Sequence, residues 1–156
     1  MRKWHVELYK PLYRADFVRL NSEWIRTCFR LEPSDREIFN DPEGKIIKPG
    51  GQIFLAVDEA GTCIGCCALI RQGAGIFELA KMAVAPESQG SGVGKLLGEA
   101  ALSYARAQGA KKVFLEGNTR LEASIRLYRK LGFREVPLGE VVYDRCNIRM
   151  EMDVKL

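Results

Sequence analysis

With 156 residues, 47% of them hydrophobic and 28% charged, the chain has the composition of a single globular domain, residues 1–156, and not that of a disordered protein. Its apolar runs are only strand-length and no signal-peptide stretch follows the N-terminus, so we expect a cytoplasmic protein with no membrane partner. The net charge of +4 is spread along the chain. This argues against a nucleic-acid partner, because a nucleic-acid groove usually shows a dense stripe of lysine and arginine.

One strand and two helices are predicted in the N-terminal third. Residues 4–8 alternate between apolar and polar side chains, as a strand does. A helix is expected to begin near Asp16, a good N-cap, and its buried stripe comprises Phe17, Leu20, Trp24, Ile25 and Cys28. The run Ser34-Asp35-Arg36-Glu37 reads as a capping box and predicts a short second helix. Residues 41–51 are rich in proline and glycine, which predicts a loop.

The remaining elements predict the fold class. Strands are expected over residues 53–57, 62–70 and 77–84, and the short turns between them indicate an antiparallel meander. A helix over 92–108, a strand over 113–116, a helix over 123–131, and strands near 133 and over 146–154 follow. The order predicts an α+β fold: a mixed, mostly antiparallel twisted sheet of six to seven strands with about four helices on both faces.

Five cysteines, odd in number and unevenly spaced, raise the question of a metal or redox site. Cys63 and Cys66 form a C-x-x-C pair, but the second pair that a zinc site needs is absent and His5 is the only histidine. In a strand, residues 63 and 66 would also point to opposite faces. We therefore predict no metal, and cysteines that are small core residues in a reducing compartment.

A glycine-rich turn, Gln89-Gly90-Ser91-Gly92-Val93-Gly94-Lys95, lies between the 77–84 strand and the following amphipathic helix. Glycines allow a tight turn and a close approach to a ligand, and the first helical turn offers unpaired N–H groups. Together they predict an anion site, most naturally for phosphate. A nucleotide P-loop is excluded because Gln89 and Leu96 stand where glycine and Ser or Thr are required. A dinucleotide fingerprint is excluded because Lys95 replaces its third glycine.

The Q-x-x-G-x-G pattern of this turn resembles the GNAT superfamily of N-acetyltransferases. The resemblance runs from Phe77 through the turn to the pattern Leu127-Tyr128-x-x-x-Gly132-Phe133, and so covers the C-terminal half of the domain. It implies the acyl-CoA N-acyltransferase fold and an enzyme that moves an acetyl group from acetyl-CoA to a primary amine by direct attack. The coenzyme-binding residues that it implies are Met82, Ala83, Val84, Gln89, Gly90, Ser91, Gly92, Val93, Gly94, Lys95, Asn118 and Tyr128.

Two catalytic side chains are implied by the same resemblance. Tyr128 would protonate the leaving thiolate, and Glu78 would be the general base, while the backbone N–H of Val84 would bind the thioester oxygen. With a period of two, Glu78, Ala80, Met82 and Val84 share one face of their strand, and such neighbours would raise the pKa of the carboxyl group. The alternatives are a Tyr128 that only packs in the core and a Glu78 that is solvated or ion-paired.

One position departs from the pattern of the family. Many relatives carry a coenzyme-contacting asparagine seven residues before the tyrosine, where this chain has Leu121. Asn118, ten residues before the tyrosine, either replaces it or leaves a contact through the backbone alone. Basic side chains before and on the last helix either receive the 3′-phosphate of the coenzyme or form a solvated face: Arg120, Arg126, Arg129 and Lys130.

The acceptor site is implied to lie between residues 21–39 and 138–145. Its candidate lining residues are Trp24, Arg26, Phe29, Glu32 and Tyr143. They do not identify the acceptor, which can be a small molecule or a peptide amine, nor do they show whether the acyl group is longer than acetyl. Two rival functions are a non-catalytic acyl-CoA-binding sensor and a nucleic-acid-binding protein. Homodimers are frequent in the family, so a homodimer is a further possible assembly.

Overall fold

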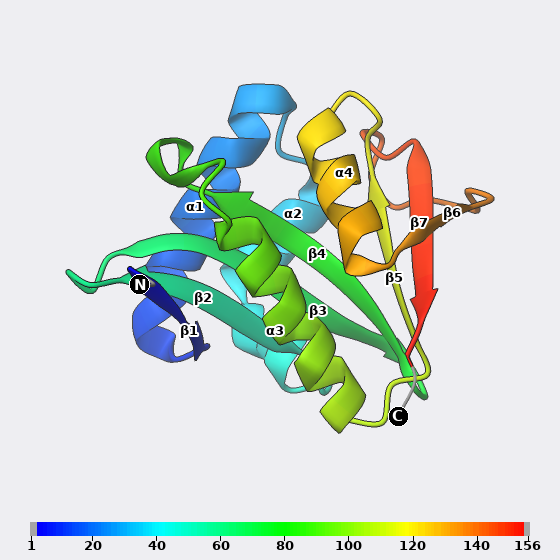
Figure 1. Ribbon diagram of the computed structural model, residues 1–156, viewed down its shortest axis with the longest axis horizontal. Helices are drawn as coiled ribbons and strands as arrows, with labels where there is room; N and C mark the ends of the chain where they lie inside the picture. Colours follow the sequence, from blue (N-terminus) through cyan, green and yellow to red (C-terminus); the bar gives the residue numbers. More distant parts are fainter. Residues whose placement is uncertain (1–2, 155–156) are drawn as a thin grey trace.

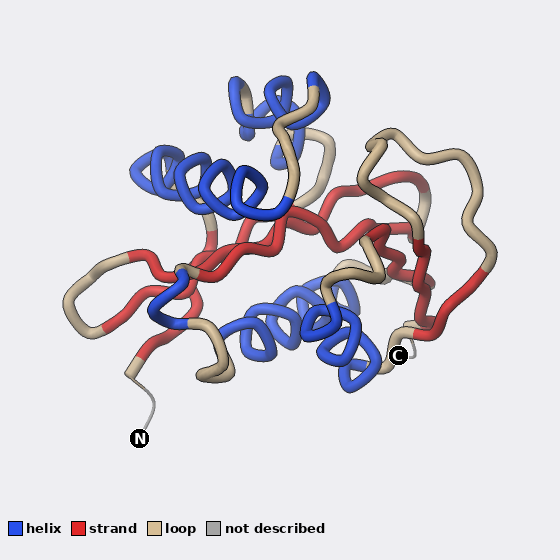
Figure 2. Tube along the Cα trace, turned by 90° about the horizontal axis from the view of Figure 1, so that it is seen from above, coloured by secondary structure: helices blue, strands red, loops and turns tan. Residues whose placement is uncertain are grey.

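The computed structural model of the protein describes residues 3–154. Seven strands form one sheet in the order β1-β2-β3-β4-β5-β7-β6, and helices cover both of its faces (Figure 1, Figure 2). The strands are β1 Trp4–Leu8, β2 Gln52–Asp58, β3 Cys63–Gly73, β4 Ile76–Val84, β5 Lys112–Gly117, β6 Arg134–Val136 and β7 Ile148–Asp153. The helices are α1 Arg14–Cys28, α2 Pro33–Asn40, α3 Val93–Ala107 and α4 Glu122–Leu131, with short helical turns η1 Pro11–Tyr13, η2 Glu43–Ile47 and η3 Pro86–Ser88. The predicted fold class is confirmed.

Strand pairing opens the sheet between β4 and β5. Neighbouring strands from β1 to β4 are antiparallel, as are β5 with β7 and β7 with β6. β4 and β5 are parallel and pair over only three residues, from Ile76 opposite Lys112 to Glu78 opposite Phe114. Beyond that point the two strands separate, as Figure 1 shows. A gap in the middle of the sheet is therefore built into the fold.

Each face of the sheet carries its own core. α3 and α4 cover one face, where Leu97 and Val113 are fully buried, and α1 and α2 cover the other, where Phe17 is fully buried. Full burial of one such side chain stabilises the fold by about 1.5–3 kcal/mol. α3 and α4 pack closely because Gly98 has no Cβ, which would lie 2.6 Å from Cδ1 of Leu131. No helix within residues 3–154 is long and apolar enough to cross a membrane.

The capping box of α2 lies two residues earlier than predicted. Glu32 is the N-cap, and its backbone N–H donates to the Asp35 carboxylate over 2.9 Å. The predicted start at Ser34 is wrong because Pro33 occupies the first helical position, where its missing N–H costs nothing and its φ suits a helix. The shift matters for the site, since it places Asp35 inside the protein with 0% exposure.

Other element boundaries differ from the predictions by small amounts. α1 begins at Arg14, directly after η1, so Asp16 lies in its first turn and is not the N-cap. The segment 41–51, predicted to be a loop, contains the π-helical turn η2. β7 begins at Ile148 and not at residue 146. Helix termini and strand ends are set by tertiary contacts as much as by local sequence, which limits such predictions.

A bulge in β3 overturns one prediction about the cysteines. Ile64 is an extra residue opposite β2, so the alternation of side chains is reversed there. Cys63 and Cys66 therefore face the same core, beneath α1, whereas Cys67 faces α3. All five cysteines are free thiols. Within the described range, no group of three or more His, Cys, Asp and Glu side chains could hold a metal ion.

Candidate active site

A cleft opens where β4 and β5 separate. It contains about 780 Å³ of empty space, including the part open to solvent. The cleft is lined by α1, β4, β5, α4 and the loop before β7. Its aromatic, charged and polar lining residues include Trp24, Phe29, Glu78, Lys81, Glu116, Asn118, Tyr128, Tyr143 and Arg145, and Met82 lines it from β4.

A bulge in β4 determines which side chains reach each end of the cleft. Lys81 has φ +55°, and the β3–β4 register shifts at this point. Met82 and Val84 consequently pack toward the core under α3 and α4, while Glu78 and Ala80 face the α1 side. The prediction that all four residues share one strand face is wrong, because the extra residue reverses the alternation.

Glu78 is a partly buried carboxyl group at the point where the β4–β5 ladder ends. Its Oε1 accepts a hydrogen bond of 2.8 Å from the Gln72 side chain. Burial and the nearby Glu116 raise the pKa of Glu78, and the bond from Gln72 opposes them. The predicted general base therefore lies in the cleft with a pKa above the ordinary value of a glutamate.

Glu116 is a second carboxyl group of the cleft, which the motif-based reading of the sequence missed. It shares a strand face with Phe114, the residue paired with Glu78, so the two glutamates face the same side of the sheet. Its side chain is 10% exposed and its nearest cation is Arg149, 4.0 Å away. Burial raises its pKa, and Arg149 opposes this effect. The only sign of it in the sequence is the alternation along β5, where Glu116 follows the core residues Val113 and Leu115 on the opposite face of the strand.

Tyr128 lines the cleft from α4. Gly132, at φ +111°, ends the helix, and the Phe133 N–H donates back to the Tyr128 carbonyl over 3.0 Å. This cap brings the two rings together, edge to face, with centroids 6.2 Å apart. Burial raises the pKa of the Tyr128 phenol to about 12. No hydrogen-bond partner of its hydroxyl is found among residues 3–154, so the hydroxyl is available to a ligand.

The glycine turn forms the exposed N-terminus of α3. Gly90 and Gly92 have φ of +79° and +92°, and no atom lies within 4 Å of the position of either missing Cβ. Leu96 is bonded to the Gly92 carbonyl, so the N–H groups of the preceding helical residues have no partner in the helical ladder. Gln89 joins the turn to the end of β4 through a 3.0 Å bond from its amide to the Val84 carbonyl. These features fit the pyrophosphate of a coenzyme.

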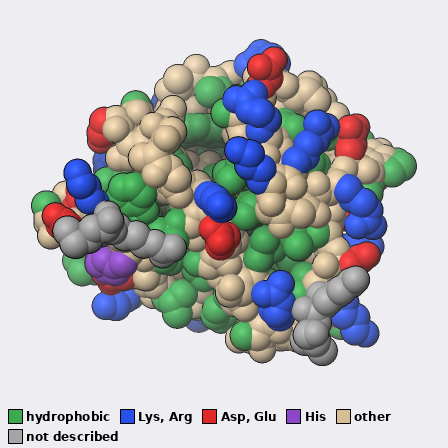
Figure 3. Space-filling model, in the orientation of Figure 1, with side chains coloured by type: hydrophobic (Ala, Val, Ile, Leu, Met, Phe, Trp, Pro, Cys, Tyr) green, Lys and Arg blue, Asp and Glu red, His purple; other side chains and the backbone are tan. Residues whose placement is uncertain are grey.

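Basic side chains gather over α4 on the face that it shares with α3 (Figure 3). Arg126, Arg129 and Lys130 are exposed on this helix. Arg120 lies apart from them, with its guanidinium 4.8 Å from the Phe29 ring and bonded to the Cys28 carbonyl. The three basic side chains on α4 thus form one exposed cluster, and Arg120 is not part of it.

The predicted acceptor residues separate into two groups. Trp24, Phe29 and Tyr143 line the cleft, with the Trp24 and Phe29 rings 6.5 Å apart. Arg26 lies in a different groove, on the outer side of α1. Glu32 does not line the cleft either. Its two carboxylate oxygens accept hydrogen bonds from the Asp144 N–H and from Arg145.

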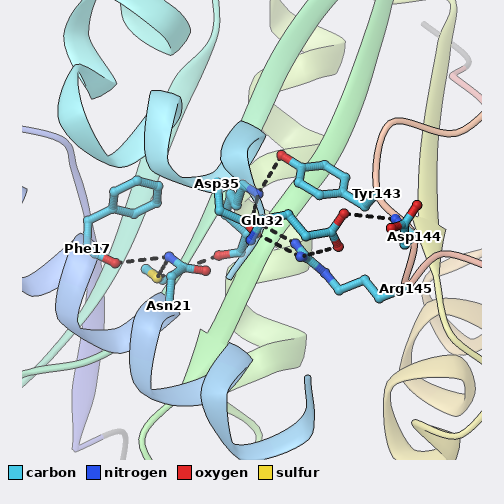
Figure 4. Close-up of polar contacts among 9 residues, drawn as sticks. Phe17, Asn21, Glu32, Asp35, Tyr143, Asp144 and Arg145 are labelled. Atoms are coloured by element: carbon cyan, nitrogen blue, oxygen red, sulfur yellow. Dashed lines mark hydrogen bonds and ion pairs between the residues drawn. The ribbon is translucent and has the colours of Figure 1, made fainter. Parts of the chain in front are cut away.

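A buried ion cluster joins α2, the β4 bulge and the loop before β7 (Figure 4). Asp35 accepts two bonds from Arg145, of 2.7 and 2.8 Å, and one of 2.7 Å from Lys81. Lys81 also donates to the Tyr143 hydroxyl over 2.8 Å. Burial alone would raise the pKa of Asp35, but the bonds from Arg145 and the charge of Lys81 outweigh it and lower the pKa to about 2. The wall of the cleft is therefore held by residues that are distant in sequence.

The side chain of Asn118 is also hydrogen-bonded within this wall of the cleft. Its amide donates to the Arg145 carbonyl over 2.7 Å, and its side-chain oxygen accepts a bond from the Arg120 N–H. Leu121, at the position where many relatives have asparagine, lines the cleft. Both residues are thus at the cleft, and the side chain of Asn118 is already bonded to backbone groups.

The sequence and the fold both match known acetyltransferases. The family model described as acetyltransferase (GNAT) family matches residues 12–133. The chain belongs to the acetyltransferase (GNAT) family. It is 34% identical to a Schizosaccharomyces pombe protein named as an uncharacterized N-acetyltransferase, over 88% of this chain and 87% of the relative. It is 35% identical to an IAA acetyltransferase of Azospirillum brasilense, over 90% and 92% of the two chains.

Solved structures show the same fold at lower sequence identity. A GNAT family acetyltransferase from Staphylococcus aureus matches with a TM-score of 0.87 at 19% identity, over 97% of this GNAT chain and 99% of the other. A GNAT superfamily phosphinothricin acetyltransferase from Sinorhizobium meliloti, solved in complex with acetyl-CoA, matches with a TM-score of 0.82 at 18% identity, over 98% and 89%. The predicted family, fold and acetyl-CoA-dependent acetyltransferase class are confirmed.

Proposed function

We propose that this GNAT protein transfers the acetyl group of acetyl-CoA directly to a primary amine, with Tyr128 as general acid and Glu78 as general base. The observation that carries the proposal is that both side chains line one cleft, at the gap between β4 and β5. They come from different elements, β4 and α4, and approach the gap from different sides of the sheet. A carbonyl carbon held in the gap would have a base on one side and an acid on the other.

The coenzyme is assigned to the α3–α4 side of the sheet. The glycine turn and the orphan N–H groups of the first turn of α3 bind its pyrophosphate, and the basic side chains of α4 add positive charge nearby. Met82 lines the cleft on β4, so the backbone from Met82 to Val84 is the segment that runs beside the pantetheine arm. When bound, acetyl-CoA supplies the activated acetyl group.

Tyr128 suits the role of an acid that protonates a departing thiolate. Its phenol is protonated at neutral pH, since the ordinary pKa of a tyrosine is about 10 and burial raises that of Tyr128 to about 12. The edge-to-face contact with Phe133 fixes its ring, so the hydroxyl is held in one place. A positioned general acid of this kind typically contributes about 10²–10⁴-fold in rate.

Glu78 suits the role of a base that accepts a proton from an ammonium ion. A protonated alkylamine, with a pKa of about 10.4, must lose a proton before it can attack. Because the pKa of Glu78 is raised, it lies closer to the pKa of the ammonium ion, which makes the proton transfer less unfavourable. The carboxylate also lies at the β4–β5 gap. Water can relay the proton because the cleft is partly open to solvent.

The test is thermal unfolding with acetyl-CoA at up to about 1 mM, with ATP and NAD as controls, followed by an assay of thiol release with a panel of amines. At 100 times its dissociation constant, a ligand adds about 2.7 kcal/mol to the free energy of unfolding, or several degrees in melting temperature. A shift that is specific to acetyl-CoA, together with amine-dependent thiol release, supports the proposal. A shift with no thiol release for any amine would instead favour a non-catalytic acyl-CoA sensor.

A further inference from the structure

The charged side chains of the cleft indicate which charge an acceptor can carry there. Two cations line the cleft, Lys81 and Arg145, and both already form ion pairs with carboxylates of the protein. Lys81 donates to Asp35 and to the Tyr143 hydroxyl, and Arg145 donates to Asp35 and Glu32. Two positive charges are thus balanced by the two negative charges of Asp35 and Glu32 before any ligand arrives.

The carboxyl groups that line the cleft are paired less closely: no ion pair of Glu78 is found among residues 3–154, and Glu116 is paired only with Arg149, at 4.0 Å. Glu78 accepts one bond from a neutral amide, that of Gln72. No described residue donates a hydrogen bond to Glu116. Arg149 lies 4.0 Å from it and bonds more closely to Glu151, over 3.1 Å, although Glu151 also pairs with Lys112 over 3.2 Å. Both glutamates are desolvated by burial, which raises their pKa values. An incoming cation would relieve this imbalance, and an incoming anion would increase it.

The other lining side chains add an apolar wall and leave no cation for a carboxylate. Trp24, Phe29 and Tyr143 supply the aromatic surface. The amide of Asn118 is bonded to the backbone. Arg120 stacks on Phe29 but does not line the cleft, so it could meet an anion only at the rim, away from the reacting amine.

We propose that Glu116 acts with Glu78 to select acceptors whose amine is cationic, is attached to an apolar body and has no carboxylate on the carbon that bears it. The proposal rests on the proposed function, since it concerns the acceptor end of the same cleft. The ammonium group binds between the two glutamates at the β4–β5 gap, and the apolar body packs on the aromatic wall. An α-amino acid is rejected because its carboxylate meets two carboxylates, one without an ion pair and one paired only at 4.0 Å, while the two cations that line the cleft are already bonded to Asp35 and Glu32.

Matched acceptors test this selection. Tryptophan, tyrosine and phenylalanine are each compared with their decarboxylated amine and with their carboxamide, by initial rates of thiol release from acetyl-CoA. We expect kcat/KM to be at least about tenfold higher for the amine and the amide than for the amino acid, because like charges in a desolvated site are strongly disfavoured. An amino acid that is acetylated as well as its amine and amide overturns the proposal.

Glu116→Gln tests the residue itself and keeps the shape of the side chain. The ratio of kcat/KM for tryptamine to that for tryptophan should fall by about threefold or more, because one repelling charge is removed. A ratio taken within one enzyme is insensitive to a loss of folded protein or of overall activity. Glu59→Gln, an exposed glutamate in the turn between β2 and β3, is the matched control and should leave the ratio unchanged. An unchanged ratio in Glu116→Gln refutes the role of Glu116.

The two levels of proposal fail in different ways. If acetyl-CoA raises the melting temperature and other amines release thiol, but the amines and amides of the matched set do not, the acceptor class is wrong while the proposed function stands. If acetyl-CoA causes no shift, the proposed function itself fails.

Discussion

The two halves of the cleft, named the coenzyme half and the acceptor half after the ligands proposed for them, are built in different ways. The coenzyme half uses one contiguous stretch of chain, from β4 through the glycine turn and α3 to Tyr128 on α4, and its key geometry is local: two positive-φ glycines and a glycine-capped helix. The acceptor half is assembled from α1, α2, the β4 bulge and the loop before β7, which meet at Asp35. Its cohesion depends on buried charges that are far apart in sequence.

This difference teaches that the halves should respond differently to mutation. A local geometry can be damaged without loss of the fold, because few other residues depend on it. A buried ion cluster cannot, because removing one charge leaves the others uncompensated. The predictions below test this contrast, in order of decreasing effect.

The largest effect is expected for Tyr128→Phe, which removes the proposed acid and leaves the ring packing against Phe133. We expect kcat to fall by about 10²–10⁴-fold while the melting-temperature shift with acetyl-CoA persists. Steady-state kinetics and thermal unfolding measure the two quantities. Tyr104→Phe is the control, since Tyr104 packs edge to face on Phe54 from α3 and does not line the cleft. A kcat in Tyr128→Phe equal to that of Tyr104→Phe would remove the assignment.

Asp35→Asn should be the most damaging change to the acceptor half. It leaves Lys81 and Arg145 buried beside a neutral amide, and the free energy of unfolding should fall by about 3–5 kcal/mol. Urea denaturation measures the loss. Asp153→Asn, in the exposed pair with Arg134 at 3.8 Å, should change stability by no more than about 0.5 kcal/mol. A loss in Asp35→Asn as small as that of the control would show that the cluster does not hold the wall.

Gly92→Asp tests the coenzyme half. It places a side chain and a negative charge at a position with φ +92°, in the proposed pyrophosphate turn. Acetyl-CoA affinity should fall by about 100-fold or more, read as the loss of the melting-temperature shift. Gly109→Asp, at φ +76° after the end of α3 and with equally open surroundings, carries the same backbone strain away from the site. It should keep the shift. Equal losses in the two variants would mean that strain, and not the ligand site, is responsible.

The smallest effect is a loss of stability in acid. The pKa of Asp35 is lowered from 3.8 to about 2 in the folded protein, so its ionised form stabilises the fold at any pH above the unfolded value. That contribution, roughly 2 kcal/mol, should disappear as the pH falls from about 4 to about 2. Denaturant titrations at several pH values in the wild type and in Asp35→Asn measure it. A variant with the same pH dependence as the wild type in this window would contradict the assignment.

Much of the coenzyme half could be predicted from the sequence, because its signals are local. Gly90 and Gly92 adopt the left-handed backbone that only glycine takes easily, and Gly132 ends α4 where the pattern places it. The order of strands and helices follows from hydrophobic periodicity, so the sheet and its α+β class were also predictable. Each of these conclusions depends only on residues within one helix or strand and the turn next to it.

Only the tertiary structure decided the two bulges and the ion cluster. Periodicity assumes an unbroken strand, so the extra residues at Ile64 and Lys81 placed Cys66 and Met82 on faces that alternation did not predict. The pairing of Asp35 with Arg145 joins positions 110 residues apart, and no local pattern marks it. These long-range contacts also explain why Glu32 is paired with Arg145 while Glu116 has no closer cation than Arg149 at 4.0 Å, because the fold decides which cations reach each carboxylate. Local sequence therefore determined the coenzyme turn, and long-range charge pairing determined the acceptor wall.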